Sequence, residues 1–172
     1  MIDLKNGSRA YPQQSGWKLQ KRSKDLDGGQ NLLRIEQIFH ALNDASVDYL
    51  LVGGLASVLY GVPRTTVDID ISIRPKEDHI FKAIEALESL GLVPDTSVPD
   101  EILGQGGVTF SNEREIDMIT DLKGIDFNTA WDRRKQIEYE GITVQVISRE
   151  DLITALKAVG RQKDLDDLKD LE

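Results

Sequence analysis

The sequence predicts a single α/β domain, an α+β arrangement in which a mixed sheet is flanked by helices. Apolar residues recur at helical spacing in several segments of the 172-residue chain. Between these segments lie short runs with the alternating or continuous apolar character of strands. Helices and strands follow one another in mixed order, as expected for helices packed on one sheet. A chain of this length buries roughly 70% of its unfolded surface, so one core suffices.

The N-terminal end differs from the rest of the chain. Residues 1–30 show no helical or strand periodicity, so we expect a poorly structured N-terminal arm and place the domain at residues 31–172. Residues 1–29 carry a formal charge of +3, which leaves −12 for the remainder. A basic arm on an acidic body offers a contact for RNA, whereas a solvated tail or a non-native leader is the plainer interpretation.

Punctuation by glycine and proline divides the first half of the domain into elements. Asn31 is expected to cap a helix whose apolar face includes Leu32 and Phe39. Polar and apolar residues alternate between Val67 and Ile73, which is typical of a strand with one buried face. The other expected elements are a buried strand at residues 49–52, a short helix at 55–60 and a helix between Pro75 and Gly91.

The second half mixes strands and helices more closely. Ser148 with Asp151 resembles a capping box, which predicts a helix that Gly160 ends. Residues 94–107 carry no clear period and are expected to form a long loop. The remaining expected elements are strands at 108–111 and 116–120, a helix at 127–134, a hairpin of 136–139 with 142–147, and helices at 149–159 and 163–171.

Composition excludes several classes of site. The chain has no cysteine, which removes disulfides, thiol nucleophiles and cysteine-bearing zinc sites, and its two histidines are too few for a histidine-rich metal site. The net charge of −9 argues against a protein that coats nucleic acid through a basic surface. Apolar runs are far shorter than the roughly 18 residues of a membrane helix. Without a recognisable signal segment, we expect a cytoplasmic location and no membrane contact.

One group of residues, two glycines and three aspartates, is typical of a catalytic or metal-binding site. The pair Gly53-Gly54 follows a buried strand, and thirteen residues later the next strand carries Asp68 and Asp70. Glycines between a strand and a helix let backbone N–H groups approach an anion closely. Residues two apart on a strand leave the same face, so the two carboxylates repel each other unless a divalent cation lies between them. Asp117 on a later strand adds a third carboxylate if that strand lies beside the first.

These residues carry a family resemblance. The run from Leu51 to Ala56, followed by the run from Gly61 to Asp70 with its Arg-Thr-Thr-Val-Asp-Ile-Asp ending, closely resembles the nucleotidyltransferase superfamily of DNA polymerase beta. The closer resemblance is to the bacterial minimal nucleotidyltransferases of the AbiEii/AbiGii toxin-like group. Their C-terminal pattern is similar to Ser148 to Leu152, Lys157, Gly160-Arg161, Lys163-Asp164 and Asp167. The resemblance covers roughly residues 45–172 and implies a nucleotidyltransferase-like mixed sheet.

The resemblance also implies an activity, namely metal-assisted transfer of a nucleoside monophosphate from an NTP to a hydroxyl. Asp68 and Asp70 would hold Mg²⁺ or Mn²⁺ on the triphosphate, and Asp117 would help bind a second ion and deprotonate the acceptor. Many members have serine where this chain has Gly54, so only the Gly54 backbone N–H is expected to serve there. The implied nucleotide contacts are Gly53, Gly54, Arg64, Thr65, Thr66 and Lys157.

Each of these residues also has a plainer interpretation. An Asp-x-Asp pair on a strand is often part of a solvated sheet face, and Asp117 then simply faces water. Arg64 in that case only pairs with a carboxylate. Lys157 lies at the edge of an apolar stripe, where lysines commonly extend their charge into solvent.

The acceptor and the biological setting stay open at the level of sequence. RNA such as a tRNA 3′ end, a protein side chain and a small molecule such as an aminoglycoside all offer the required hydroxyl. The resemblance implies a toxin–antitoxin setting with a partner toxin or antitoxin, and the short chain favours completion of the site by a partner or a homo-oligomer. The alternative function is a non-catalytic antitoxin-like binding protein on the same fold. The intact carboxylates argue against it, because an inactive protein has no reason to keep a costly cluster of charges.

Overall fold

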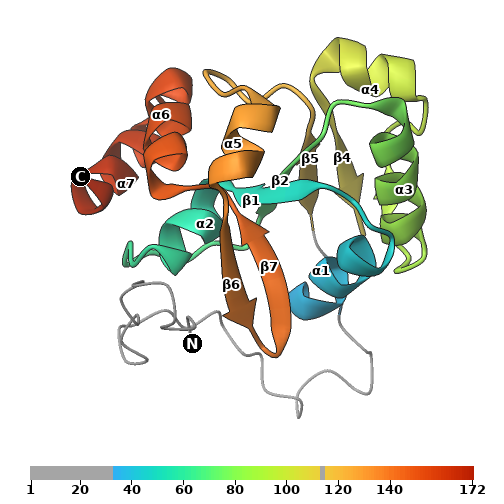
Figure 1. The fold of residues 1–172 in the computed structure, drawn as a ribbon, viewed down its shortest axis with the longest axis horizontal. Helices are drawn as coiled ribbons and strands as arrows, with labels where there is room; N and C mark the ends of the chain where they lie inside the picture. Colours follow the sequence, from blue (N-terminus) through green and yellow to red (C-terminus); the bar gives the residue numbers. More distant parts are fainter. Residues whose placement is uncertain (1–32, 113–114) are drawn as a thin grey trace.

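A computed structural model describes residues 33–112 and 115–172 as one α/β unit (Figure 1). The expected N-terminal arm, residues 1–30, lies outside the described residues, and so do Asn31 and Leu32. The first helix begins at Ile35 with Arg34 at its N-cap, so the expected cap at Asn31 was wrong. Within the described residues the sheet has the order β3-β4-β5-β2-β1-β7-β6. Its strands are β1 (Tyr49–Val52), β2 (Ile69–Ile73), β3 (Val93–Pro94), β4 (Gly107–Ser111), β5 (Ile116–Ile119), β6 (Lys135–Tyr139) and β7 (Ile142–Val146).

The strand directions confirm the predicted mixed sheet. β1 and β2 are antiparallel, whereas β2 with β5 and β1 with β7 are parallel pairs. The outer pairs, β3 with β4, β4 with β5 and β6 with β7, are antiparallel. The predicted hairpin between Tyr139 and Ile142 is therefore present, and Glu140 in its turn adopts a positive φ of 48°.

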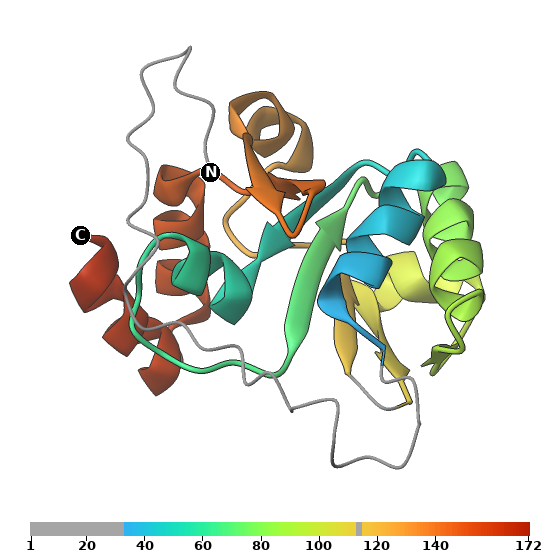
Figure 2. The same cartoon turned by 90° about the horizontal axis from the view of Figure 1, so that it is seen from below.

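Helices gather into two groups at opposite sides of the sheet, which is seen in two views (Figures 1 and 2). α1, α3 and α4 form one group, and α2, α6 and α7 form the other. Among residues 33–112 and 115–172, no helix is both long and apolar enough to cross a membrane. The helices are α1 (Ile35–Asp44), α2 (Gly53–Leu59), α3 (Glu77–Glu88), α4 (Pro99–Gln105), α5 (Phe127–Arg133), α6 (Arg149–Val159) and α7 (Gln162–Leu171).

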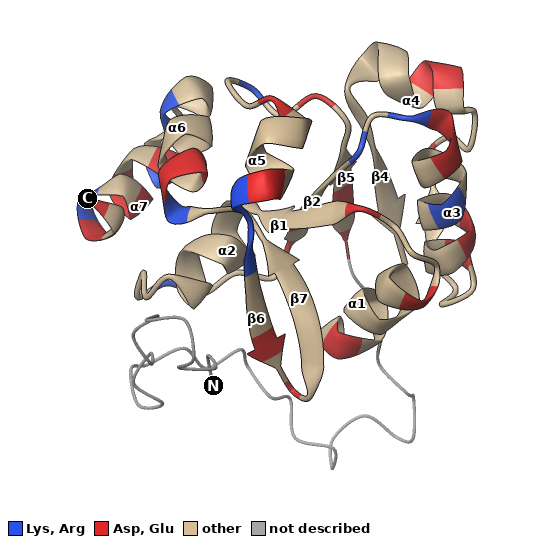
Figure 3. Ribbon diagram, viewed as in Figure 1, with Lys and Arg blue, Asp and Glu red and all other residues tan. Residues whose placement is uncertain are grey.

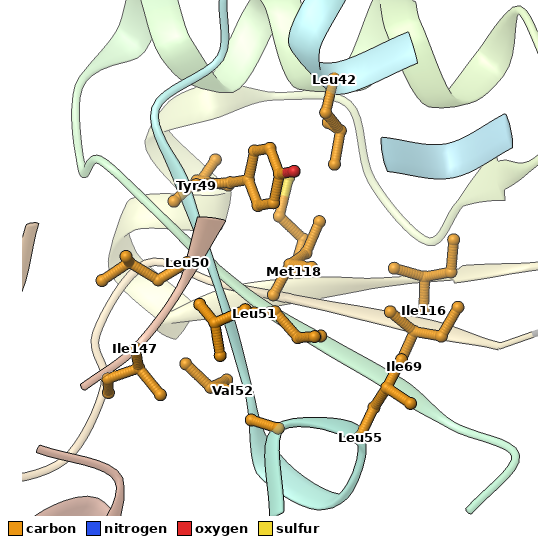
Figure 4. Close-up of a cluster of buried hydrophobic side chains, with 14 of the residues drawn as sticks. Leu42, Tyr49, Leu50, Leu51, Val52, Leu55, Ile69, Ile116, Met118 and Ile147 are labelled. Carbon is orange, nitrogen blue, oxygen red and sulfur yellow. The ribbon is translucent and has the colours of Figure 1, made fainter. Parts of the chain in front are cut away.

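The core is centred on β1, whose four side chains are all buried (Figure 4). Tyr49 stacks on Phe39 of α1 with 5.7 Å between ring centroids. Leu51 is fully buried on β1, where its partners are Ile71 of β2 on one side and Val146 of β7 on the other. Each such side chain contributes about 1.5–3 kcal/mol by leaving water. This burial fixes the end of β1, from which the chain turns into α2.

Two elements depart from the sequence-based expectation. Residues 94–107 are not a long loop, because they run from the end of β3 through α4 to the start of β4. Pro99 begins α4 in the first helical turn, where the missing N–H of proline costs nothing. Ile102 is its one buried residue, so the segment shows no periodicity. The other departure is β2, which begins at Ile69 rather than at Val67, so Asp68 precedes the strand.

Candidate active site

The sheet brings Asp70 and Asp117 together on neighbouring parallel strands. Asp70 of β2 is opposite Asp117 of β5 in the register, and Val52 of β1 is the partner of Asp70 on its other side. Thr109 of β4 is opposite Asp117 and donates a hydrogen bond from its Oγ1 to Asp117 Oδ1 at 2.7 Å. The structure therefore pairs two of the three predicted carboxylates in one row across four strands.

The Gly53-Gly54 turn lies directly against this carboxylate row. Gly53 has a φ of +62°, a left-handed conformation that favours glycine. A Cβ at Gly53 would lie only 2.1 Å from Asp70 Oδ2, so the missing side chain is what admits the carboxylate. The backbone N–H of Gly54 donates a hydrogen bond to Asp70. The turn thus packs against a protein carboxylate, and the Gly54 N–H, which was expected to serve a phosphate, also lowers the pKa of Asp70.

Burial and charge act together on Asp70. Burial raises the pKa of the Asp70 carboxyl above its ordinary value of 3.8, and the charge of Asp117 raises it further. The Gly54 N–H and the positive charges of Lys163 and Arg161 oppose this rise in pKa. The two carboxylates therefore repel each other, and a cation placed between them would remove this repulsion.

Asp68, the third predicted carboxylate, lies outside the strands that form this row. It is exposed and lies one residue before β2, with its backbone oxygen accepting a hydrogen bond from Thr66 Oγ1 at 3.3 Å. Alternation continued by one residue places Asp68 on the same side of β2 as Asp70. Its carboxylate is nevertheless open to water, whereas that of Asp70 is largely enclosed.

Arg64 and Thr66 cover the other glycine of the turn. A Cβ at Gly54 would lie 2.9 Å from Thr66 Oγ1 and 3.2 Å from an Arg64 terminal nitrogen, Nη2. The other terminal nitrogen of Arg64 lies 2.7 Å from Oδ2 of Asp167, a buried residue of α7. Arg64 thus makes the carboxylate pair that its plainer interpretation foresaw, while its guanidinium still lies over the predicted phosphate-binding turn. Thr65, in contrast, is exposed.

Lys157, which the resemblance predicts as a triphosphate contact, pairs with a carboxylate in the structure. It is exposed on α6 and forms an ion pair with Glu172. The positive charges that act on Asp70 are instead Arg161 and Lys163, from the junction of α6 and α7. A sequence signal for them exists, because Gly160-Arg161 and Lys163-Asp164 belong to the C-terminal pattern of the family resemblance.

The cationic side of the site belongs to the last two helices. Figure 3 shows positive and negative residues interleaved on α6 and α7, whereas the charged residues of α4 are acidic. Arg161 precedes α7 and donates from Nε to Asp164 Oδ2 at 2.8 Å. This hydrogen bond raises the pKa of Arg161, and the charges of Asp70 and Asp117 raise it further. Arg161 is therefore a positive charge held by Asp164 and close enough to Asp70 and Asp117 to interact with their charges.

A metal ion at this site would find few protein ligands. Within the described residues, no group of three or more His, Asp or Glu side chains is arranged to hold a metal. Mg²⁺ in phosphate-transfer sites is commonly bound by one or two carboxylates together with substrate phosphates, rather than by an all-protein cage. The close pair Asp70 and Asp117, with raised pKa at Asp70, fits that smaller requirement.

The chain as a whole belongs to a nucleotidyltransferase family. Residues 30–172 match the family described as "Nucleotidyltransferase of unknown function (DUF6036)", so the chain is a member of that family. The match includes the glycine turn, both paired carboxylates and the two C-terminal helices. No curated protein matches the chain in sequence.

Solved structures agree on the fold at low sequence identity. A candidate nucleotidyltransferase from Thermotoga maritima is 17% identical, with a TM-score of 0.55 over 78% of this chain and 88% of that one. The lincosamide antibiotic adenylyltransferase LnuA, with lincomycin bound, is 19% identical, with a TM-score of 0.54 over 82% and 98%. ANT(2")-Ia in complex with adenylyl-2"-tobramycin is 18% identical, with a TM-score of 0.51 over 69% and 70%. The nucleotidyltransferase-like sheet expected from the sequence is thereby confirmed.

The contact between Gly53 and Asp70 predicts an asymmetry between two glycine substitutions. Gly53 and Gly61 both have positive φ, but a Cβ at Gly61 would meet nothing within 4 Å. Gly61→Ala should cost about 1–2 kcal/mol for the left-handed backbone alone. Gly53→Ala must also displace Asp70, so we expect at least about 2 kcal/mol more, measured by urea denaturation. Equal losses for the two variants would contradict the close packing of Asp70 on Gly53.

The raised pKa of Asp70 predicts the stability of Asp70→Asn. A carboxyl whose folded-state pKa exceeds its unfolded value destabilises the protein when ionised, and this cost disappears as the pH falls through the raised pKa. Without divalent cations at pH 7, Asp70→Asn should melt roughly 2–4 °C above the wild type, or about 1 kcal/mol for a chain of this size. The difference should shrink on acidification toward 3.8. A variant that melts lower at every pH would assign the carboxylate a stabilising role.

Proposed function

We propose that this protein is an enzyme that transfers a nucleoside monophosphate from an NTP to an acceptor hydroxyl, with dependence on Mg²⁺ or Mn²⁺. The observation that carries the proposal is the row formed by the glycine turn, Asp70 and Asp117, faced by positive charges from the end of the chain. Membership of a nucleotidyltransferase family supports the same activity. The row places acidic groups beside basic ones, as transfer from a magnesium-bound triphosphate requires.

The residues divide into a nucleotide side and an acceptor side. Asp70 would hold the divalent cation on the triphosphate together with Asp68, which lies exposed just before β2, and Asp117 would help bind a second ion on the acceptor side. The bound cation would supply neutralisation of the triphosphate charge as pyrophosphate leaves. Arg64, Arg161 and Lys163 would contact phosphate oxygens, with Thr66 beside the turn. Thr65 and Lys157 stay predictions from the resemblance, since Thr65 is exposed and Lys157 pairs with Glu172.

Asp117 would act on the chemical step. A bond forms between the acceptor oxygen and the α-phosphorus, and the bond from that phosphorus to the oxygen shared with the β-phosphate breaks. The acceptor proton passes to the Asp117 carboxylate, and pyrophosphate leaves with the electron pair. Thr109 donates to Oδ1 of Asp117, so Oδ2 of Asp117 would accept this proton.

A small-molecule hydroxyl is the acceptor that the comparisons favour. LnuA has lincomycin bound, and ANT(2")-Ia holds an adenylylated tobramycin, so two proteins of the same fold act on small molecules. The net charge of −9 makes a polyanionic RNA acceptor less suitable. RNA and protein acceptors, a toxin–antitoxin partner, the AbiEii/AbiGii likeness, a homo-oligomer and a cytoplasmic location stay predictions from the sequence.

A labelled-transfer assay tests the proposal. The protein is incubated with each of four α-labelled NTPs, with Mg²⁺ or Mn²⁺ or with EDTA, and with small hydroxyl-bearing molecules, total RNA or protein extract. Thermal shift with each NTP and metal reports binding in the same samples, because a ligand of the folded state alone raises the melting temperature. We expect transfer and a shift with at least one NTP, both lost in Asp70→Asn. The absence of both with every millimolar NTP would overturn the proposal.

Asp117 should affect turnover more than binding. A positioned base contributes in the transition state, so Asp117→Asn should reduce turnover at least about a hundredfold. Its NTP affinity by calorimetry should change little, because Asp70 and the basic residues remain. Asp121→Asn is the matched control, since Asp121 is an exposed aspartate just beyond β5 and should leave turnover unchanged. Wild-type turnover in Asp117→Asn would remove this residue from the site.

A further inference from the structure

Arg64 lies beside the glycine turn and is bound by Asp167, a residue far along the chain. Its Nη2 and Cζ lie 3.2 and 3.3 Å from where a Cβ of Gly54 would stand. Its Nη1 lies 2.7 Å from Asp167 Oδ2, across 103 residues of sequence. Only 24% of the Arg64 side chain and 6% of the Asp167 side chain are exposed. The guanidinium is thus held at one terminal nitrogen by α7, while the other faces the turn.

The buried position of Asp167 follows from the face that α7 turns inward. Asp164 and Asp167 are three residues apart on this helix, so they share the buried side with Leu168 and Leu171. A buried carboxylate is costly unless a positive group pairs with it. Each of the two aspartates has an arginine partner at the site, Arg161 for Asp164 and Arg64 for Asp167. The inward face of α7 therefore holds two arginines in place.

We propose that Asp167 is a positioning residue that fixes the Arg64 guanidinium over the Gly53-Gly54 turn as a ligand for the triphosphate, an inference that rests on the proposed function. A guanidinium carries five N–H donors in a rigid plane, so the contact with Asp167 leaves donors free for phosphate oxygens. Arginine loses rotamer freedom when it binds, and an arginine already held by Asp167 has lost much of that freedom on folding. The consequence is tighter phosphate binding without direct contact from Asp167.

The sign of one substitution separates positioning from simple electrostatics. Asp167 carries a carboxylate, and only the Arg64 guanidinium separates it from the proposed position of the triphosphate. If it acted only through its charge, Asp167→Asn would remove repulsion and tighten the binding of a polyanion. If it positions Arg64, the same substitution weakens binding, because the guanidinium loses its charged anchor.

The experiment measures binding of magnesium tripolyphosphate by calorimetry, a probe that carries the phosphates without a base. We expect Asp167→Asn to weaken binding by about five- to tenfold, the latter equal to about 1.4 kcal/mol. Arg64→Ala should weaken it at least as much. Adding Asp167→Asn to Arg64→Ala should cause no further loss, since the aspartate acts only through the arginine. Unchanged or tighter binding in Asp167→Asn, or a full additional loss in the double variant, would overturn the inference.

Two controls keep this result separate from folding and from the proposed function. Asp166→Asn removes the same charge from the exposed side of α7, where Asp166 pairs with Lys169, and should leave binding unchanged. Asp167→Glu keeps the charge and should retain part of the affinity. Failure of the wild-type protein to bind the probe would count against the proposed function as well. Loss on Arg64→Ala with no loss on Asp167→Asn would overturn the positioning role alone.

A measurement on the wild-type protein covers the case in which Asp167→Asn does not fold. The Nε–H resonance of Arg64, assigned with Arg64→Lys, reports how freely the guanidinium rotates and how rapidly its proton exchanges with water. Positioning requires slow rotation and slow exchange before any phosphate is added. Free rotation and rapid exchange in the protein without probe would overturn the inference.

Discussion

The arrangement of the site depends on the charge of Asp70, which is partly buried against the backbone of Gly53. A carboxylate in this position loses hydration and meets a second carboxylate, Asp117, on the adjacent strand. Both effects favour its neutral form. The Gly54 N–H and two basic residues near α7 partly compensate, which keeps a charged pair tolerable in the folded protein.

This compensation explains why the two ends of the domain are interdependent. The glycine turn and β2 lie early in the chain, while Arg161, Lys163 and Asp167 belong to its last helical hairpin. The sheet order makes the connection possible, because β7 pairs with β1 and delivers α6 and α7 beside α2. Tyr60 strengthens the junction by donating from its hydroxyl to the backbone oxygen of Ile147 at 2.6 Å. The cationic side of the site is thus assembled by long-range packing.

Gly54 shows how one residue type can change the organisation of such a site. The space that a side chain at this position would occupy is taken by Thr66 Oγ1 and the Arg64 guanidinium. A serine there would have to displace both groups, one of which is anchored to a buried aspartate. The absence of a side chain at Gly54 and the position of the Arg64 guanidinium beside the turn therefore belong to one packing arrangement.

The sequence by itself determined the elements with strong local signals: the alternation around Asp70, the glycine turn at Gly53, and the Ser148 cap of α6, whose Oγ accepts the Asp151 N–H at 3.1 Å. It also placed Asp117 on a strand. Periodicity missed α4, which buries only Ile102. Tertiary structure alone decided that Asp117 lies beside Asp70, that Arg64 pairs with Asp167, and that Arg161 and Lys163 rather than Lys157 act on the carboxylates. These facts depend on strand order and helix docking, which bring distant residues together by burial of a shared core and leave no local pattern in the sequence.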